Sequence, residues 1–418
     1  MRQRNSKWDN KKSPFTPGSP VPSEFFVGRK EQIEKLLRYV KQTLGVKPEN
    51  IFLLGDRGIG KSSFASFMRY YVSTHKKMLG IHTFLNKVST LEEMTRLIFE
   101  EIAKETQQQG WFKNIAESFG DYIKEVGLFG VTISFNPPQQ KLKELVSKFP
   151  ETLANLLKEI KKQKDGLFIA LDDINGLASK KEFAHWYKSF VDEVATHYKN
   201  FPVFVMLIGL PEQRDILYNH QPSLMRIFRI IEIEKLFNEE VKEFFSKAFK
   251  QVAIKVKPDA MNVMTIYSSG LPLLMHEIGD ATFWADNDGI IDVKDAVEGI
   301  LEAAENVGRK YLDPKVYRTI RSERYRSILR KLGKEMPLYR GFRKKEVEAK
   351  LTEPEKKVFN NFLRRMQELG VIERDVEGGR GAYKFVNEIY PLYIRMESIK
   401  HPKKANMKYS KPTNNFRT

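Results

Sequence analysis

The feature that most constrains this chain is the stretch from Ile51 to Phe64, which reads IFLLGDRGIGKSSF. Its first four residues are apolar and predict a buried strand, and the segment from Gly55 to Ser62 then matches the pattern G-x-x-x-x-G-K-[ST]. In such a loop the glycines let the backbone N–H groups turn inward, and the helix that follows adds its positive N-terminal end. The stretch therefore predicts a loop that binds the phosphates of a nucleotide. The alternative is a glycine-rich turn with a solvated lysine.

Two side chains of the loop have specific expected roles. Lys61 is placed to reach the β- and γ-phosphates as a point charge, and the hydroxyl of Ser62 is placed to ligate Mg²⁺. The expected cofactors are therefore ATP and Mg²⁺. The predicted nucleotide contacts in this loop are Gly55, Asp56, Arg57, Gly58, Ile59, Gly60, Lys61, Ser62 and Ser63.

A second motif follows later in the chain, where the apolar run from Gly166 to Leu171 ends in Asp172 and Asp173. A hydrophobic run that ends in two acids is common by itself, but behind a phosphate-binding loop it predicts the Mg²⁺ and water side of the same site. Asp172 is expected to hold the water shell of Mg²⁺, and Asp173 to orient or polarise the attacking water. Lys61, Asp172 and Asp173 are therefore predicted to catalyse ATP hydrolysis.

Around these motifs, apolar runs alternate with amphipathic stretches. Strands are predicted at 51–54, 81–88, 128–135, 166–171, 202–208 and 230–233. This alternation predicts an α/β fold, a P-loop NTPase whose parallel sheet is covered on both faces and holds the nucleotide at the carboxyl ends of its strands. From Asn238 to about residue 304 the pattern is helical, which predicts a helical domain after the sheet.

Charge is unevenly distributed along the 418 residues, whose net charge is +18. From Arg309 onward there are 29 Lys and Arg against 13 Asp and Glu, and the first 13 residues add 5 basic and 1 acidic. Such asymmetry suggests a terminal module that meets a polyanion, the alternative being a basic surface that serves solubility alone. The absence of cysteine excludes disulfides and thiol catalysis. The longest apolar run, Phe201 to Leu210, is about half the length of a membrane span, so we expect a soluble, cytoplasmic protein without membrane contact.

The basic C-terminal quarter has a pattern of its own. Helices are predicted at 316–332, 343–351 and 353–370, followed by two short strands around a glycine-rich turn at 377–381. Three helices and such a hairpin resemble a winged helix-turn-helix, whose third helix enters the major groove of duplex DNA. The alternative is a module that packs on the rest of the chain or on a protein partner. The predicted DNA contacts are Lys356, Lys357, Arg364, Arg365 and Arg380.

Five features in order resemble one family over roughly residues 24–304, namely Phe26-Val27-Gly28-Arg29, the phosphate loop, Leu171-Asp172-Asp173, the arginines Arg226 and Arg229, and Gly270-Leu271-Pro272. They resemble the AAA+ ATPases of the origin-recognition/initiator clade and the neighbouring STAND signalling ATPases. The resemblance implies a nucleotide between an α/β core and a helical lid, and self-association into an oligomer. It also implies that Phe26, Val27, Gly28 and Arg29 cover the adenine and that Pro272 contacts the nucleotide from the lid.

Arg226 and Arg229 lie where the resemblance places an arginine finger, which stabilises the transition state in a neighbouring subunit. Either could instead be a surface arginine at a helix end, where a cation meets the helix dipole favourably.

The sequence departs from this family at three places. Asp173 stands where most members have glutamate and is one methylene shorter, and a misplacement of about 1 Å can cost on the order of a hundredfold in rate. Gly209 stands where a polar sensor residue is expected, with Gln213 as a substitute, and the helix after Pro272 lacks the arginine that usually touches the γ-phosphate. These departures suggest a slowly hydrolysing switch rather than a fast motor.

The sequence thus predicts a basic Pro-rich tail (1–23), an AAA+ ATPase core (24–235), a helical lid (236–310), a winged-helix domain (311–399) and a basic disordered tail (400–418). The predicted function is that of an ATP-binding switch that binds duplex DNA through the winged helix and assembles under nucleotide control, as replication initiators or transposition regulators do. The alternative is a STAND-type signalling or defence ATPase whose winged helix binds protein partners.

Overall fold

The computed structural model describes residues 12–19, 26–45, 47–110, 123–125, 134–135, 137–335 and 341–400. The chain divides into two compact units, which we call the core unit, residues 18–236, and the helical unit, residues 1–17 together with 237–418. Most of the predicted strand at 128–135 and nearly all of the predicted tail at 400–418 lie outside the described residues. In the part of the chain that is described, no helix combines the length and the apolarity that a membrane crossing requires.

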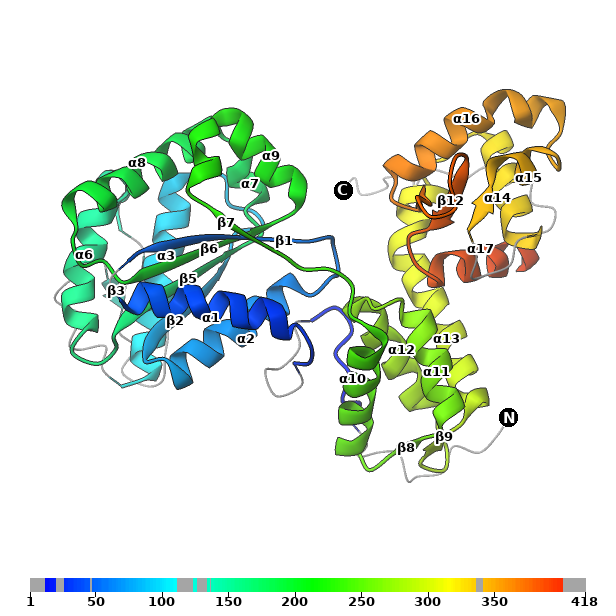
Figure 1. Ribbon diagram of the computed structural model, residues 1–418, viewed down its shortest axis with the longest axis horizontal. Coiled ribbons are helices and arrows are strands. Elements are labelled where there is room, and N and C mark those ends of the chain that lie inside the picture. The colour runs from blue at the N-terminus through cyan, green and yellow to red at the C-terminus, as the bar shows by residue number, and fades with distance from the viewer. Residues whose placement is uncertain are drawn as a thin grey trace, which may run out of the picture. The chain divides into compact units, whose positions relative to one another are not determined.

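Five parallel strands form the centre of the core unit (Figure 1). In spatial order they are β2 (Met78–Phe84), β5 (Gly166–Asp172), β6 (Val203–Gly209), β1 (Glu49–Leu54) and β7 (Arg229–Glu232). Strands β1, β5 and β6 are buried along their whole length, as expected of a parallel sheet that is covered on both faces. The predicted α/β P-loop fold is confirmed. Strand β2 ends before the predicted residue Val88, because the backbone N–H of Val88 turns back to the carbonyl of Leu85.

Helices cover both faces of this sheet (Figure 1). The large apolar core on one face joins the strands to α3 (Leu91–Gln108), α6 (Phe149–Ile160) and α8 (Lys181–His197), and α1 (Lys30–Leu44) and α2 (Lys61–His75) contact the strands as well. The remaining elements of the core unit are β3 (Ile123–Glu125), β4 (Ser134–Phe135), α5 (Gln139–Ser147), α7 (Asn175–Ala178), α9 (Pro211–His220) and the 3-10 helix η4 (Pro222–Arg226).

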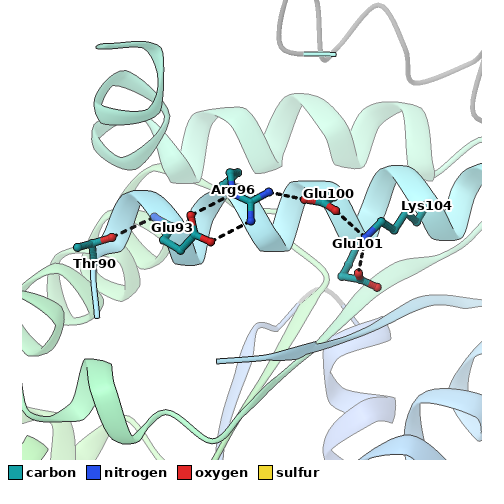
Figure 2. Close-up of polar contacts among 6 residues, drawn as sticks. All are labelled: Thr90, Glu93, Arg96, Glu100, Glu101 and Lys104. Carbon is teal, nitrogen blue, oxygen red and sulfur yellow. Dashed lines mark hydrogen bonds and ion pairs between the residues drawn. The ribbon is translucent and has the colours of Figure 1, made fainter. Parts of the chain in front are cut away.

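Helix α3 shows how a strongly charged stretch becomes an ordered helix (Figure 2). The hydroxyl of Thr90 caps its first turn by accepting from the backbone N–H of Glu93. Further along, Arg96 joins Glu93 to Glu100 on the outer face. Lys104 then joins Glu100 to the next glutamate. Each such ion pair contributes only about 0.2–0.5 kcal/mol. The series of ion pairs therefore stabilises the helix itself, and the buried apolar face of α3 holds it on the sheet.

The helical unit contains two groups of elements. The first is α10 (Asn238–Gln251), β8 (Lys255–Val256), α11 (Pro258–Ser268), α12 (Pro272–Ala285), β9 (Ile290–Ile291) and α13 (Val293–Val307). A π-helical segment, η5 (Gly308–Tyr317), leads to the second, which is α14 (Glu323–Glu335), β10 (Phe342–Arg343), α15 (Lys344–Glu348), α16 (Glu353–Glu368), β11 (Ile372–Arg374), β12 (Ala382–Phe385) and α17 (Ile389–Lys400). Three of these strands form an antiparallel sheet in the order β10-β12-β11. Residues from 312 to 394 share one apolar core, which includes Ile328, Phe359 and Phe362.

The N-terminal segment is held in the helical unit by one aromatic side chain. Phe15 is 4% exposed. Its ring contacts three aromatic rings of α10, those of Phe244, Phe245 and Phe249. It also packs directly on Gly279 of α12, where a Cβ would lie 2.3 Å from the Phe15 ring. The sequence predicts only a basic Pro-rich tail here, so this contact was not predicted.

His276 of α12 is buried beside Phe15. Its Nδ1 accepts a hydrogen bond from the backbone N–H of Thr16, 3.0 Å away, and its ring centroid is 4.9 Å from that of Phe244. Burial lowers the pKa of His276 to about 4. Because Nδ1 accepts only when it carries no proton, this contact requires the neutral ring.

We therefore expect acid to destabilise the helical unit through His276. Above pH 6.5 the ring is neutral in the folded and the unfolded chain, so its contribution to the free energy of unfolding is complete. As the pH falls from 6.5 to about 4, the unfolded chain binds a proton that the folded chain does not, and the loss reaches ~3 kcal/mol. Denaturant unfolding near neutral pH and near pH 4.5 checks this, because His276→Gln should lose less stability on acidification than the parent chain. His197→Gln, which changes an exposed histidine, is the control. An equal loss of stability on acidification in His276→Gln, the control and the parent chain would contradict the expectation.

Candidate nucleotide-binding site

The predicted phosphate loop joins β1 to α2 at the carboxyl end of the sheet. A Cβ at Gly55 would lie 2.7 Å from the carbonyl oxygen of Ile233 and 2.9 Å from the side chain of Ile59, so only glycine fits there. Gly60 has a φ of 95°, and α2 begins directly after it at Lys61. Among the described residues no side chain caps α2, and its first turn contains no acidic residue. The N–H groups at its start are therefore available to an anion.

Lys61 folds back over this loop. Its Nζ donates hydrogen bonds to the carbonyl oxygens of Gly55, at 2.7 Å, and of Asp56, at 2.8 Å. Burial lowers the pKa of Lys61, and the negative charges of Asp172 and Asp56 oppose that shift. Asp173 acts on Lys61 in the same direction as Asp172. The structure thus brings the lysine of the first motif and the carboxylates of the second into one site.

The segment before α1 packs on the same loop. Phe26 stacks on Phe67 of α2, with ring centroids 4.5 Å apart and an angle of 13° between the planes. Arg29 is 7% exposed, and its guanidinium donates to the carbonyl oxygen of Ile59, 3.1 Å away. The segment predicted to cover the adenine therefore packs against the phosphate loop. Its contact with adenine stays a prediction for Phe26, Val27, Gly28 and Arg29.

The two carboxylates lie at the end of β5, between β2 and β6. Asp172 is the last residue of the strand and is 3% exposed. Asp173 follows with a φ of 57°, in the left-handed region that Asp enters more readily than most residues. Its carboxylate accepts a hydrogen bond from Nδ2 of Asn175. Burial, and next the negative charge of Asp172, raise the pKa of Asp173.

A histidine that sequence reasoning passed over is bonded to Asp172. His82 lies on β2, and its Nε2 is 3.0 Å from Oδ2 of Asp172. Its Nδ1 is 3.0 Å from the hydroxyl of Ser66 on α2. Because an ionised carboxylate only accepts hydrogen bonds, Nε2 is the donor in the pair with Asp172. No spacing in the sequence signals this contact, because it depends on the register that pairs β2 with β5.

These residues fit Mg²⁺ that arrives with a nucleotide. Within the described ranges, no group of three or more Asp, Glu or His side chains is placed to hold a metal ion. Ser62 and Asp172 offer a hydroxyl and a carboxylate, and Mg²⁺ is usually bound by one or two carboxylates together with substrate phosphates. The described residues bond only one oxygen of Asp172, Oδ2, which is held by His82. The second oxygen, Oδ1, therefore remains for the metal or its water.

The two candidate finger arginines lie at the opposite ends of the strands from the loop. Arg226 ends η4 and is exposed, and Arg229 begins β7 beside the start of β1. Arg229 is paired within its own chain, since its Nε donates to Oε2 of Glu49 at 2.8 Å and its guanidinium lies 4.8 Å from the ring centroid of Tyr39. Arg229 is paired with Ile51, four residues before Gly55, which is roughly 13 Å along the strand, and its guanidinium is held at Glu49, so neither arginine is placed at the loop of its own chain. This arrangement favours Arg226 over Arg229, and the finger role stays a prediction.

Two further predicted positions have local roles in the structure. Oε1 of Gln213 accepts from the backbone N–H of Leu210, 2.9 Å away, and so caps the start of α9. Pro272 begins α12 in the helical unit, directly after a turn in which Ser269 and Gly270 have positive φ. Its contact with a nucleotide stays a prediction.

The predicted DNA-binding side chains lie on α16 and in the turn between β11 and β12. Lys357 and Arg380 are exposed. Lys356 is 2.8 Å from Glu353, and Arg365 is 3.0 Å from Glu368. Helix α16 also borders a polar pocket of about 320 Å³ at the start of α14, whose lining includes Arg321, Ser322, Asn361, Arg364 and Arg365. Arg321 is not among the predicted DNA contacts, because only the fold brings it beside Arg364.

Residues 26–189 match the family model of the AAA ATPase domain. This match contains both motifs, the loop around Lys61 and the carboxylates that follow β5. The prediction of an AAA+ P-loop ATPase domain is confirmed for this segment.

Solved structures share the fold along most of the chain. A Walker-type ATPase of Pyrococcus abyssi is 18% identical with a TM-score of 0.55, covering 91% of this chain and 99% of that one. The ORC2 protein of Aeropyrum pernix, solved as ADPNP–ADP complexes, is 12% identical with a TM-score of 0.58, covering 93% of this chain and 97% of that one. At such identities the likeness is one of fold alone. A search of curated proteins finds no match.

Proposed function

Because residues 26–189 form an AAA ATPase domain, we propose that the chain is an ATP-controlled switch that binds duplex DNA and assembles into an oligomer under nucleotide control. The observation that carries the proposal is the convergence of Lys61 with Asp172 and Asp173 at the carboxyl end of the sheet. Replication initiators and transposition regulators are the types of protein that this combination suits. Binding of labelled ATP, and its loss in Lys61→Ala, test the nucleotide part of the proposal.

Binding begins with the loop backbone and the uncapped start of α2, which attract the phosphates. Lys61 then exchanges the carbonyl oxygens of Gly55 and Asp56 for phosphate oxygens, which are stronger acceptors because they are charged. Ser62 and Asp172 hold Mg²⁺, which when bound neutralises phosphate charge.

Hydrolysis depends on Asp173, which we assign to the attacking water. Its side chain is less buried than that of Asp172, and its raised pKa is typical of a carboxylate that handles a proton. The short side chain and its hydrogen bond to Asn175 limit its reach, so we propose that hydrolysis is slow. A slow ATPase suits a switch, since the bound nucleotide then defines a long-lived state.

Assembly would bring a finger arginine to the site, because neither Arg226 nor Arg229 is placed at the loop of its own chain. Arg226 is exposed at the far ends of the strands, where a neighbouring copy can meet it. We therefore propose that Arg226 completes the site of an adjacent copy. Size-exclusion chromatography with light scattering, in ATP and in ADP, tests whether the oligomeric state depends on the nucleotide.

DNA binding is proposed for the part of the helical unit from α14 to β12, which we interpret as a winged helix. Helix α16 exposes Lys357 and Arg364 on its outer face, and Arg380 extends the basic surface at the turn of the hairpin. The pocket with Arg321, Arg364 and Arg365 is a place where three guanidinium groups can meet one phosphate. The ion pairs with Glu353 and Glu368 are exposed and weak, so a phosphate can replace them.

Replacing Arg321, Arg364 and Arg365 together by alanine should weaken duplex DNA binding and flatten its salt dependence. The three side chains are proposed to meet one phosphate, so the loss of that contact should lower the magnitude of the slope of log K against log salt by about 0.9. Fluorescence anisotropy of a labelled duplex over a range of NaCl concentrations measures both quantities. Arg38→Ala, an exposed arginine on α1, is the control and should leave the slope unchanged. An unaltered slope in the triple variant would exclude this surface.

A STAND-type signalling ATPase is the second candidate. Two observations favour it. Several cations of α16 are paired with glutamates of the same helix. In the predicted lid, the helix that lacks the usual arginine buries His276 among aromatic rings. Such a protein would not bind duplex DNA and would co-purify with tightly bound ADP. Anisotropy measurements and chromatography of the nucleotide released on denaturation distinguish the two functions.

A further inference from the structure

The side chains of Ser66, His82 and Asp172 form a chain of hydrogen bonds across three elements of the core unit. Ser66 lies one helical turn after Ser62, and its hydroxyl is 3.0 Å from Nδ1 of His82. The other ring nitrogen, Nε2, is 3.0 Å from Oδ2 of Asp172. Helix α2, strand β2 and strand β5 each contribute one member, so the phosphate-binding helix and the carboxylate strand are connected through an imidazole.

Two members of this hydrogen-bonded series are buried, and Ser66 is half-buried. The side chains of His82 and Asp172 are each 5% exposed. A buried carboxylate needs hydrogen-bond donors, and His82 is the donor that the described residues provide. The ring also packs on Phe84, with the two ring centroids 4.5 Å apart. His82 thus has a fixed position from which it can fix the rotation of the Asp172 carboxylate.

We propose that His82 is a positioning residue that orients Asp172 for Mg²⁺, with Ser66 orienting His82 in turn. The hydrogen bond from His82 to Oδ2 keeps the Asp172 side chain in one rotamer. Oδ1 is then the oxygen that faces the metal or its water. The inference rests on the proposed ATPase function, because it concerns the Mg²⁺ that accompanies the nucleotide. Partners that orient a metal ligand in this way typically change metal affinity by about 10–100-fold when they are removed.

The test is a Mg²⁺ titration of the full chain with a fluorescent ATP analogue, together with its affinity in EDTA. His82→Leu replaces the imidazole by an apolar side chain of similar size, which removes both ring nitrogens. We expect it to raise the half-saturating Mg²⁺ concentration by about 10–100-fold and to leave the affinity in EDTA within about twofold. His82→Gln, whose amide can replace Nε2–H, should restore the Mg²⁺ response to within about threefold of the parent chain.

Two further variants make the test independent of folding defects. Ser66→Ala removes only the support at Nδ1 and should shift the Mg²⁺ titration in the same direction by a smaller factor. His75→Leu changes an exposed histidine at the end of α2 and should behave as the parent chain does.

The inference is overturned if His82→Leu and Ser66→Ala both titrate with Mg²⁺ as the parent does. It is also overturned if His82→Leu loses affinity equally in EDTA and in Mg²⁺, because that result would describe a packing residue. If the parent chain itself binds no nucleotide, the proposed function fails and the inference fails with it.

Discussion

Replacing Lys61 by alanine is expected to weaken ATP binding by about a hundredfold or more. The ammonium group would make charge-assisted hydrogen bonds to phosphate oxygens, each contributing about 1.5–3 kcal/mol, and two of them account for at least that factor. Calorimetric titration of ATP into the parent chain and the variant measures the change directly.

Loss of binding in this variant should not come from unfolding. Burial lowers the pKa of Lys61, so the folded core unit does not depend on the charge of this residue for its stability. Thermal unfolding without nucleotide should therefore be similar in the two proteins, and Lys41→Ala, an exposed lysine on α1, should bind ATP normally. If Lys61→Ala kept both its nucleotide and its affinity for DNA, the proposal of an ATP-controlled DNA-binding protein would be wrong.

Replacing Asp173 by asparagine is expected to reduce the rate of ATP hydrolysis by about 10²–10⁴-fold, the usual contribution of a group that accepts a proton in the transition state. Asparagine keeps the size and tolerates the left-handed backbone at this position, so the local structure should persist. ATP should bind as tightly as before or more tightly, because one of two neighbouring negative charges is removed. Phosphate release under single-turnover conditions, with affinity measured separately, distinguishes a loss of chemistry from a loss of binding.

A matched control lies at the other end of the same strand. Asp165 is exposed just before β5, and Asp165→Asn should hydrolyse ATP at the parent rate. If Asp173→Asn hydrolysed ATP within about threefold of the parent, the attacking water would have to be activated by another group.

The local structure that the sequence predicts around the site is the part that a short stretch of chain determines. The strand, the glycines and Lys61 follow one another without interruption, so their geometry follows from local backbone rules. The buried strand before Asp172 was equally visible. Even the departure at Asp173 has a local reason, because its φ of 57° suits an aspartate better than a glutamate.

The parts that could not be predicted depend on register and on long-range packing. His82 approaches Asp172 because β2 and β5 pair in one register, which the sequence does not state. Phe15 lies in a polar, proline-containing stretch, and the aromatic rings that bury it come from α10, far along the chain. Arg229 has the same limitation, since its partner Glu49 begins a different strand. Each contact needs a tertiary structure before it can be recognised.

The burial of Phe15 also determines the route of the polypeptide. Since residues 1–17 belong to the helical unit and 18–236 to the core unit, the chain passes from one unit to the other twice. The ATPase domain is therefore inserted between two stretches of chain that together form the helical unit. Removal of the first 17 residues would therefore leave the ATPase domain whole and still uncover the aromatic rings of α10 on which Phe15 packs.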